Sequence, residues 1–260
     1  MSTHEKIQSF ARTHVSRVTR PGTVRQAVIM AGGKGTRLHP YSALLPKPLM
    51  PVGDMPILEL LLRQMKQAGI AEVLVAVNHL RHLIEAFFGD GSKFGLRIRY
   101  ISEDKPLGTA GALGNMLDQL HDTFIVSNGD LLTNMDLTAM ARQHFETDAD
   151  ASIGVFQREN TIDFGLIEFD AENRLSAYRE KPKTLYFVSM GIYILEREAV
   201  LPHLRPNEYL DIPSLMLALR AANRDVRCYH DDGMWLDIGR PDDFALAQTL
   251  FEQNPGLFLR

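Results

Sequence analysis

Apolar positions in the first half of the chain follow two alternating patterns. Short apolar, β-branched runs predict buried strands, and longer stretches with apolar residues three and four positions apart predict amphipathic helices. The predicted strands are Val24–Met30, Glu72–Val77, Leu96–Ile101 and Thr123–Val126, and the predicted helices are Ile57–Gln67, Leu80–Phe88 and Ala110–Leu120. This alternation predicts parallel strands joined by right-handed crossovers.

The pattern changes at Ala151, where shorter strands follow one another with few helices between them. The predicted strands here are Ala151–Phe156, Gly165–Phe169, Leu175–Arg179, Val188–Leu195 and Val226–Tyr229, and the predicted helices are Asp211–Ala222 and Asp242–Glu252. We therefore expect an α/β fold: a Rossmann-like mixed, mainly parallel sheet flanked by helices, with a smaller antiparallel region.

Composition narrows the classes of protein that remain. The 260 residues are 45% hydrophobic and 23% charged, which is enough to bury a substantial core. A formal net charge of −4, with no basic run interleaved with aromatic residues, argues against nucleic-acid binding. Cys228 is the only cysteine, and neither a signal peptide nor a membrane span is evident. We expect a cytoplasmic protein with no membrane partner.

A glycine-rich turn directly follows the first predicted strand. Gly32, Gly33 and Gly35 can adopt positive φ and expose backbone amides, and Arg37 and Lys47 add two cations to the same loop. An arginine fork together with a lysine point charge suits a polyphosphate. In parallel sheets, ligands gather at the carboxyl ends of strands, where this turn lies.

Two familiar phosphate motifs do not match this turn. A Walker A loop needs Lys and then Ser or Thr after its last Gly, whereas Gly35 is followed by Thr36 and Arg37. A dinucleotide fingerprint needs a third Gly or Ala where this chain has Leu38. A P-loop NTPase and a hydride-transfer enzyme are therefore disfavoured.

The segment GGKGTRLHPYSALLPKPLMPVGDMPIL resembles the signature of the sugar-1-phosphate nucleotidylyltransferases. The resemblance continues through LGTAGAL, NGD, FG, EKP, GIY and WLDIGRPDDF in the family's order, from Val24 to Gln248. It is closest in texture to members that act as mannose-1-phosphate guanylyltransferases. The resemblance implies that an NTP and a sugar 1-phosphate react to give an NDP-sugar and pyrophosphate, within a nucleotidyltransferase domain at residues 24–253. Residues 24–150 would form its nucleotide-binding half and residues 151–253 its sugar-binding half.

The resemblance also implies roles for individual residues. Arg37, Lys47 and Lys181 would be catalytic cations, with Lys181 holding the phosphate of the sugar. Asp130 and Asp237 would hold Mg²⁺, because nucleotidyl transfer brings two anionic reactants together and Mg²⁺ binds through few carboxylates plus phosphate oxygens. The nucleotide contacts would be Ala31, Gly32, Gly33, Gly35, Thr36, Arg37, Glu103, Gly108, Thr109 and Asn128, and the sugar contacts Gly165, Glu180, Lys181 and Ser189. A phosphate nucleophile is already ionised, so no histidine is needed as a base.

The base is expected to be read by an acidic residue just before LGTAGAL, either Glu103 or Asp104. A carboxylate only accepts hydrogen bonds, and guanine presents two adjacent donors to it. Cytosine offers one amino group, and uracil or thymine one imide donor beside repelling carbonyls. GTP is therefore favoured, and CTP and UTP remain alternatives.

Several features depart from the family or lie outside it. Ser189 and Met190 precede the GIY strand where many relatives carry Asn, which leaves the sugar open, and Ser42 replaces a usual Thr. Transfer to a small non-sugar phosphate or phosphonate, and a non-catalytic regulatory subunit that binds sugar nucleotides, both stay open as alternatives. Residues 1–23 form a predicted N-terminal arm, and a homo-oligomer is possible.

Overall fold

The computed structural model describes residues 22–33, 35–38, 42, 44–78, 80–103 and 105–259. The predicted N-terminal arm therefore lies almost wholly outside the described residues. Across the described residues, no helix is long and apolar enough to cross a membrane.

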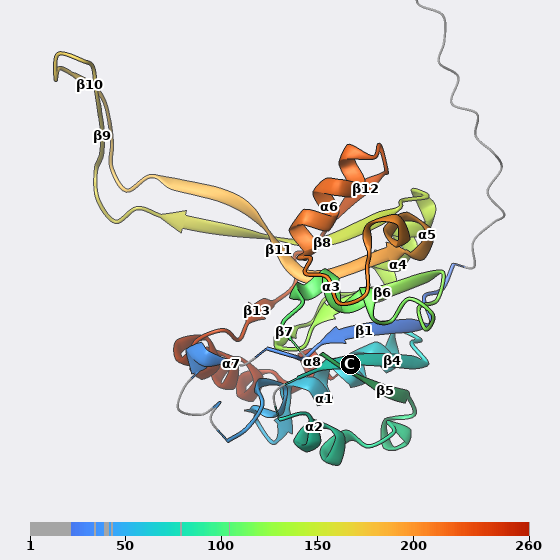
Figure 1. Ribbon diagram of the computed structural model, residues 1–260. Helices are drawn as coiled ribbons and strands as arrows, with labels where there is room; N and C mark the ends of the chain where they lie inside the picture. Colours follow the sequence, from blue (N-terminus) through green and yellow to red (C-terminus); the bar gives the residue numbers. More distant parts are fainter. Residues whose placement is uncertain are drawn as a thin grey trace, which may run out of the picture.

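A seven-stranded sheet forms the centre of the fold, with strand order β12-β8-β11-β6-β1-β4-β5 (Figure 1). β1 is parallel to both its neighbours, β4 and β6, while β11 is antiparallel to β6 and β8. The strands are β1 (Gln26–Met30), β4 (Glu72–Val77), β5 (Arg97–Ser102), β6 (Thr123–Asn128), β8 (Ala151–Thr161), β11 (Lys183–Glu196) and β12 (Val226–His230). The predicted mixed, mainly parallel sheet is confirmed.

Both faces of this sheet are buried, as the near-continuous apolar runs predict. Ala27 and Ile29 of β1 point into one core cluster, and Val28 between them points into the other. The first cluster is covered by α1 (Ile57–Gln67), α2 (Arg81–Phe88) and α4 (Leu137–Glu146), and the second by α3 (Gly108–Gly114), α5 (Arg197–Val200) and α6 (Ile212–Ala221). The side chains of β1 thus alternate between the two faces of the sheet, and helices cover both faces. This gives three layers, with the sheet between two layers of helices.

Smaller elements complete the body. α7 (Pro241–Gln253) and α8 (Pro255–Phe258) pack on a third apolar cluster with β2 (Pro51–Val52) and β3 (Met55–Pro56). A two-stranded sheet joins β7 (Leu131–Thr133) to β13 (Trp235–Asp237). The described 3-10 helices include Thr36–Leu38, Lys47–Leu49, Ser92–Phe94 and Leu201–His203.

Some predicted elements differ in extent. The helix predicted over Ala110–Leu120 begins earlier, at Gly108, and ends at Gly114, because Asn115 and Met116 close 3-10-type turns onto Ala112 and Leu113. β8 and β11 are longer than predicted, because the polar outer half of β8 still pairs with the outer half of β11. α4 was not predicted, although Asp136 caps it through the amide of Ala139.

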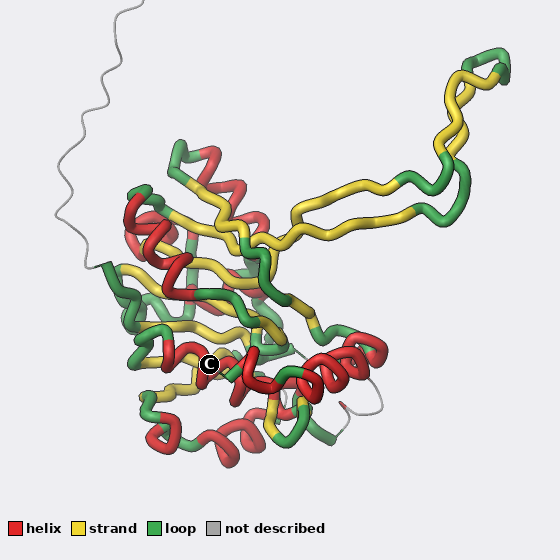
Figure 2. The backbone as a smooth tube through the Cα atoms, turned by 180° about the vertical axis from the view of Figure 1, so that it is seen from behind, coloured by secondary structure: helices red, strands yellow, loops and turns green. Residues whose placement is uncertain are grey.

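The extra length of β8 and β11 forms a projecting hairpin, defined here as residues 157–188. It leaves the body as a two-stranded ribbon and ends in a tip made of β9 (Leu166–Phe169) and β10 (Leu175–Arg179), as Figures 1 and 2 both show. β12 pairs with β8 only over residues 151–155, and β6 pairs with β11 only over residues 192–196. The hairpin is thus supported by no third strand of the described chain.

A row of glycines lets α3 lie directly against the segment 205–210. Gly108, Gly111 and Gly114 fall three residues apart, and a Cβ at Gly111 would lie 2.4 Å from the carbonyl oxygen of Glu208. The amides of Ala110 and Gly111 both donate to the carbonyl of Leu210. This backbone contact fixes the start of α3.

Gly111→Ala is expected to destabilise the fold by about 1–2 kcal/mol. Alanine gains roughly 1 kcal/mol of helix propensity, but the clash with backbone atoms costs about 2–3 kcal/mol, since neither chain segment can retreat freely. Urea unfolding measures the difference. Gly256→Ala in α8 is the control, because a Cβ there meets nothing within 4 Å and no loss is expected. Equal stability of Gly111→Ala and the wild type would contradict the packing described.

Candidate active site

Two strand ends bring the glycine turn and the NGD motif together. Met30 at the end of β1 pairs with Asn128 at the end of β6, and the amide of Gly129 donates to the carbonyl of Met30 at 2.9 Å. A Cβ at Gly129 would sit 2.9 Å from that same oxygen, so this close approach requires glycine. Ala31 to Gly33 and Asn128 to Asp130 therefore form one edge of one site.

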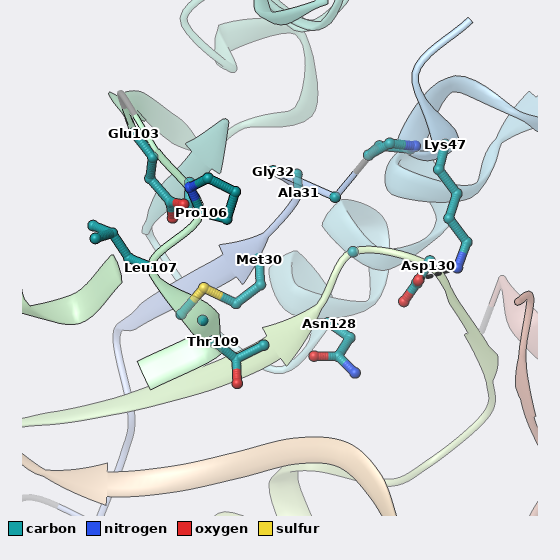
Figure 3. A pocket seen from close by; sticks show the side chains of 15 residues that line it. Met30, Ala31, Gly32, Lys47, Glu103, Pro106, Leu107, Thr109, Asn128 and Asp130 are labelled. Carbon is teal, nitrogen blue, oxygen red and sulfur yellow. Dashed lines mark hydrogen bonds and ion pairs between the residues drawn. The ribbon is translucent and has the colours of Figure 1, made fainter. Parts of the chain in front are cut away.

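A pocket of about 320 Å³ opens at this edge. Its lining comes from the glycine turn, the loop before α3 and the NGD motif, with Lys47 and Asp130 at one end and Glu103 at the other (Figure 3). Among the residues predicted to bind nucleotide, the pocket is lined by Ala31, Gly32, Gly33, Glu103, Gly108, Thr109 and Asn128. Gly35, Thr36 and Arg37 lie beyond the lining, in and beside the 3-10 helix Thr36–Leu38.

Lys47 joins the two predicted metal ligands. Its buried ammonium forms an ion pair with Asp130, and its Nζ lies 3.8 Å from Oδ1 of Asp237. β13 pairs antiparallel with β7, and the amide of Ile238 donates to the carbonyl of Asp130 at 3.1 Å, which places Asp237 beside Asp130. Asp130 and Asp237, far apart in sequence, therefore share one cation.

Burial raises the pKa of the Asp237 carboxyl, and the charge of Asp130 raises it further. Lys47 and Arg37 act in the opposite direction without cancelling these effects. Arg37 is close as well, because its Nη1 and the Asp237 Oδ2 both lie 3.6 Å from a Cβ built on Gly239. Two carboxylates therefore lie beside two cationic side chains at this end of the pocket, in a partly buried position where each charge affects the others.

The loop between the glycine turn and Lys47 is anchored locally. Gly35 has φ of +61°, and the hydroxyl of Ser42 donates to its carbonyl at 2.7 Å. A Cβ at Gly35 would approach that of Ser42 to 3.2 Å. Ser42 therefore makes a structural hydroxyl contact, in the position where the family usually has Thr.

Glu103 lies next to the glycine turn. A Cβ on Gly32 would be 3.8 Å from its Oε2, and burial raises its pKa against the opposing effect of the Leu107 amide. Asp104, the other residue considered for base recognition, lies outside the described residues. Glu103 therefore lies at the end of the pocket opposite Lys47. Met30 and apolar loop residues line the space between them.

Asn128 is held by the strand that carries the GIY motif. Gly191 has φ of +75°, and a Cβ there would lie 2.5 Å from Nδ2 of Asn128. The β8–β11 register shifts at this point, and the hydroxyls of Ser189 and Tyr193 hydrogen-bond at 2.8 Å. Ser189 therefore lies at the base of the projecting hairpin, close to the pocket strand but outside the pocket lining.

The structure does not bring the other sugar-side residues to the pocket. Gly165, Glu180 and Lys181 all belong to the projecting hairpin, which leaves the body at Ser189. They lie together there: a Cβ on Gly165 would be 2.5 Å from the Tyr178 hydroxyl, which donates to Glu180 at 3.3 Å. The predicted contacts of Gly165 and Glu180 with the sugar, and of Lys181 with its phosphate, remain predictions.

Sequence reasoning missed the apolar part of the lining. Met30, Pro48, Ala76, Pro106 and Leu107 all border the pocket. Pro106 and Leu107 come directly before Gly108, and this position beside a predicted nucleotide contact could have indicated that they line the pocket. Apolar walls with a few polar groups are the usual form of a small-molecule site.

The chain was compared with known proteins. The nucleotidyl transferase family model matches residues 26–254. Mannose-1-phosphate guanylyltransferase of Mycobacterium tuberculosis is 35% identical over 84% of this chain and 62% of its own length. UTP–glucose-1-phosphate uridylyltransferase of Synechocystis is 33% identical over 85% of this chain and 62% of its own length. The chain thus spans less than two thirds of these relatives.

Solved structures share the fold. HddC from Yersinia pseudotuberculosis superposes with a TM-score of 0.69 at 24% identity, covering 88% of this chain and 100% of that one. A putative glucose-1-phosphate thymidylyltransferase from Bacillus anthracis gives 0.71 at 23% identity, covering 88% and 95%. The mixed sheet with helices on both faces defines an α/β fold of the same kind as these structures. The chain belongs to the nucleotidyl transferase family.

Asp237→Asn is expected to raise the thermal midpoint at pH 7 by about 1–2 °C. A carboxyl whose folded pKa is raised favours folding only while protonated, so its contribution is present below its ordinary pKa of 3.8 and is lost as pH rises through the raised value. The shift is small because the side chain is half-exposed and its charges are screened.

Thermal unfolding between pH 3.5 and 7 tests this expectation, and the gain should disappear at the acid end. The exposed Asp118→Asn, which lies in the body, serves as the matched control, and its midpoint should equal that of the wild type. A lower midpoint for Asp237→Asn at pH 7 would contradict the electrostatic reading of the site.

Proposed function

We propose that this protein transfers a nucleotidyl group from an NTP to a sugar 1-phosphate, with Mg²⁺ required. The observation that carries the proposal is the pairing of Lys47 with both Asp130 and Asp237. This pairing lies at one end of a pocket that the glycine turn helps to line. In the reaction an oxygen of the sugar phosphate attacks the α-phosphorus of the NTP. The bond to the β-phosphate breaks, and pyrophosphate leaves with that electron pair.

The charges of the site match this chemistry. The attack joins two anions, so catalysis rests on positioning and on neutralising negative charge. Backbone amides of Gly32 and Gly33 border the pocket, and Lys47 and Arg37 supply positive charge at its end. The phosphate nucleophile carries no proton to remove near neutral pH, so the site needs no general base.

The donor set at the pocket mouth fits a magnesium ion. Mg²⁺ takes one or two carboxylates and completes its shell with phosphate oxygens and water, and Asp130 and Asp237 supply that number. In the described part of the chain, no three His, Cys, Asp or Glu side chains lie together in a way that could hold a metal. We therefore propose that phosphate oxygens and water complete the coordination of the ion. When bound, Mg²⁺ would polarise the α-phosphate and screen both reactants.

GTP is the proposed donor. The Glu103 carboxylate faces the pocket and can accept from the N1–H and N2–H₂ groups of guanine. The guanylyltransferase name of one relative supports this choice, while the uridylyltransferase name of another keeps UTP as the competing donor.

A matrix of the four NTPs against a panel of sugar 1-phosphates tests the proposal. Pyrophosphate release should be highest with GTP and a hexose 1-phosphate, and should stop when EDTA removes the divalent metal. Turnover with only non-sugar phosphates would replace the acceptor class. No turnover with any pair would favour a binding subunit.

Asp130→Asn is expected to lower kcat by about 100-fold or more, the size typical of lost transition-state electrostatics. Lys47 would keep only the more distant Asp237 as a partner. The exposed Asp118→Asn provides the control, with an unchanged rate. Rates near wild type for Asp130→Asn, with an unaltered circular dichroism spectrum, would refute the proposed site.

Glu103→Gln is expected to reduce kcat/KM for GTP by about tenfold and to change it much less for UTP. A glutamine amide presents one acceptor and one donor, so it leaves one guanine donor unpaired, at a cost of roughly 1–3 kcal/mol. Steady-state kinetics with both nucleotides measures the ratio. An equal loss for both would assign Glu103 a role other than base recognition.

A further inference from the structure

The projecting hairpin is poorly covered by its own chain. Nine of the sixteen exposed large apolar side chains among the described residues lie in it. These nine are Ile162, Phe164, Ile167, Phe169, Leu175, Tyr178, Leu185, Tyr186 and Phe187. An isolated two-stranded ribbon is marginal in water, and exposed apolar patches of this kind mark contact surfaces.

The tip has one apolar face. Phe169 pairs with Leu175 and Ile167 pairs with Tyr178, so the four side chains share a side of the hairpin, each at least 51% exposed. Glu168 and Arg179 form an ion pair with each other, away from these pairs. Alternation of this kind is typical of a ribbon that lies on another surface.

The same hairpin carries the sugar-side residues as a prearranged group. Glu180 is held by the Tyr178 hydroxyl beside Gly165, and Lys181 adopts φ of +42° at the junction of β10 with β11. A non-glycine residue in that region costs free energy and is often kept for function. Among the residues that the structure describes, the pocket of the body is lined only by residues between 30 and 130.

The ribbon holds this group away from its own pocket. β11 pairs with β8 through seven consecutive residues, from Lys183 to Ser189, without a register shift. At about 3.3 Å per residue, the six steps of β11 from Ser189 to Lys183 span roughly 20 Å, and Lys181 lies beyond them. Lys181 could return to its own pocket only if this ladder were bent sharply or broken.

We propose that two copies of the chain exchange their projecting hairpins, so that each copy places Lys181 and Glu180 at the sugar side of the other copy's pocket. A two-fold axis makes the exchange reciprocal, and every site then holds one body and one hairpin. The occupant is a second copy because this chain supplies both the incomplete pocket and the group that would complete it.

The rim of the pocket offers an apolar surface to receive the tip. Tyr209 is 69% exposed, and its ring lies 3.1 Å from a Cβ built on Gly108 at the pocket edge. Leu44 and Leu45 are exposed on the loop that leads to Lys47. The cationic Lys181 would enter beside the carboxylates of Asp130 and Asp237.

Assembly is tested without reference to activity. Sedimentation velocity of the full chain should show a dimer at micromolar concentration. Replacing residues 158–186 with Asn-Gly joins Gln157 to Phe187, which already face each other, by a two-residue hairpin turn. This variant removes no buried core residue and should sediment as a folded monomer. A monomeric wild type, or a dimeric variant, would overturn the exchange.

A crosslinking experiment locates the tip, again without an activity assay. Tyr178 is replaced by the photoreactive p-benzoylphenylalanine in a mixture of ¹⁵N-labelled and unlabelled chains. Crosslinks should join labelled to unlabelled peptides and map to the regions of Tyr209 or Leu44. Crosslinks confined within one chain would show that the hairpin folds onto its own body, and would overturn the proposal.

Complementation tests whether the site is shared, and this part rests on the proposed function. Differently tagged Asp130→Ala and Lys181→Ala chains are co-expressed, and the heterodimer is isolated by both tags. One of its two sites then combines an intact body with an intact hairpin, so about half the wild-type rate should return although each parent is inactive. A heterodimer as inactive as its parents, or an active Lys181→Ala parent, would refute sharing.

The matched control pairs Asp130→Ala with Asp237→Ala. Both changes lie in the body, so every site of that heterodimer is damaged and no activity should return. A wild type inactive with all substrates would remove the proposed function, while sedimentation and crosslinking would still decide whether hairpins are exchanged.

Discussion

The ion pair of Lys47 with Asp130, and the approach of the same ammonium to Asp237, is the interaction on which the site depends. Two carboxylates held this close repel each other, and only a cation between them makes the arrangement tolerable inside a half-buried pocket. Backbone pairing supplies the constraint: the β13–β7 ladder and the Ile238 amide bring Asp237 to Asp130 regardless of their charges. Backbone pairing therefore brings the two negative charges together, and the positive charge of Lys47 offsets their repulsion.

Much of the fold could be predicted from the sequence, because short apolar runs and the glycines after them indicate strands and turns. The buried run before Ala31 and the glycines after it could only form a strand and a turn, and Asn128 followed a second buried run. Their proximity then follows from the rule that parallel strands end at one edge. The seven-stranded mixed sheet and its flanking helices agree with this interpretation. The family resemblance added the pairing of Asp130 with Asp237, which no local pattern contains.

The rest could not be predicted because it depends on tertiary contacts or on residues with weak local signals. α3 ends at Gly114, where the turns onto Ala112 and Leu113 overrule an apolar pattern that continues to Leu120. The outer half of β8, residues 157–161, has too many polar residues to appear as a strand, yet it pairs continuously with β11. The sequence motifs also predict a catalytic role for Lys181, but they do not specify in which direction the projecting hairpin runs. The geometry of the hairpin thus becomes visible only in three dimensions.

The projecting hairpin contributes no residue to the three buried core clusters of the described chain. Substitutions outside the apolar face of its tip therefore escape the packing penalties that restrict change in the body. Its residues can therefore diverge quickly among descendants of this gene while the body keeps its thermal stability. Exchange of this one segment, by drift or by recombination, would leave the sheet and the pocket at its edge intact.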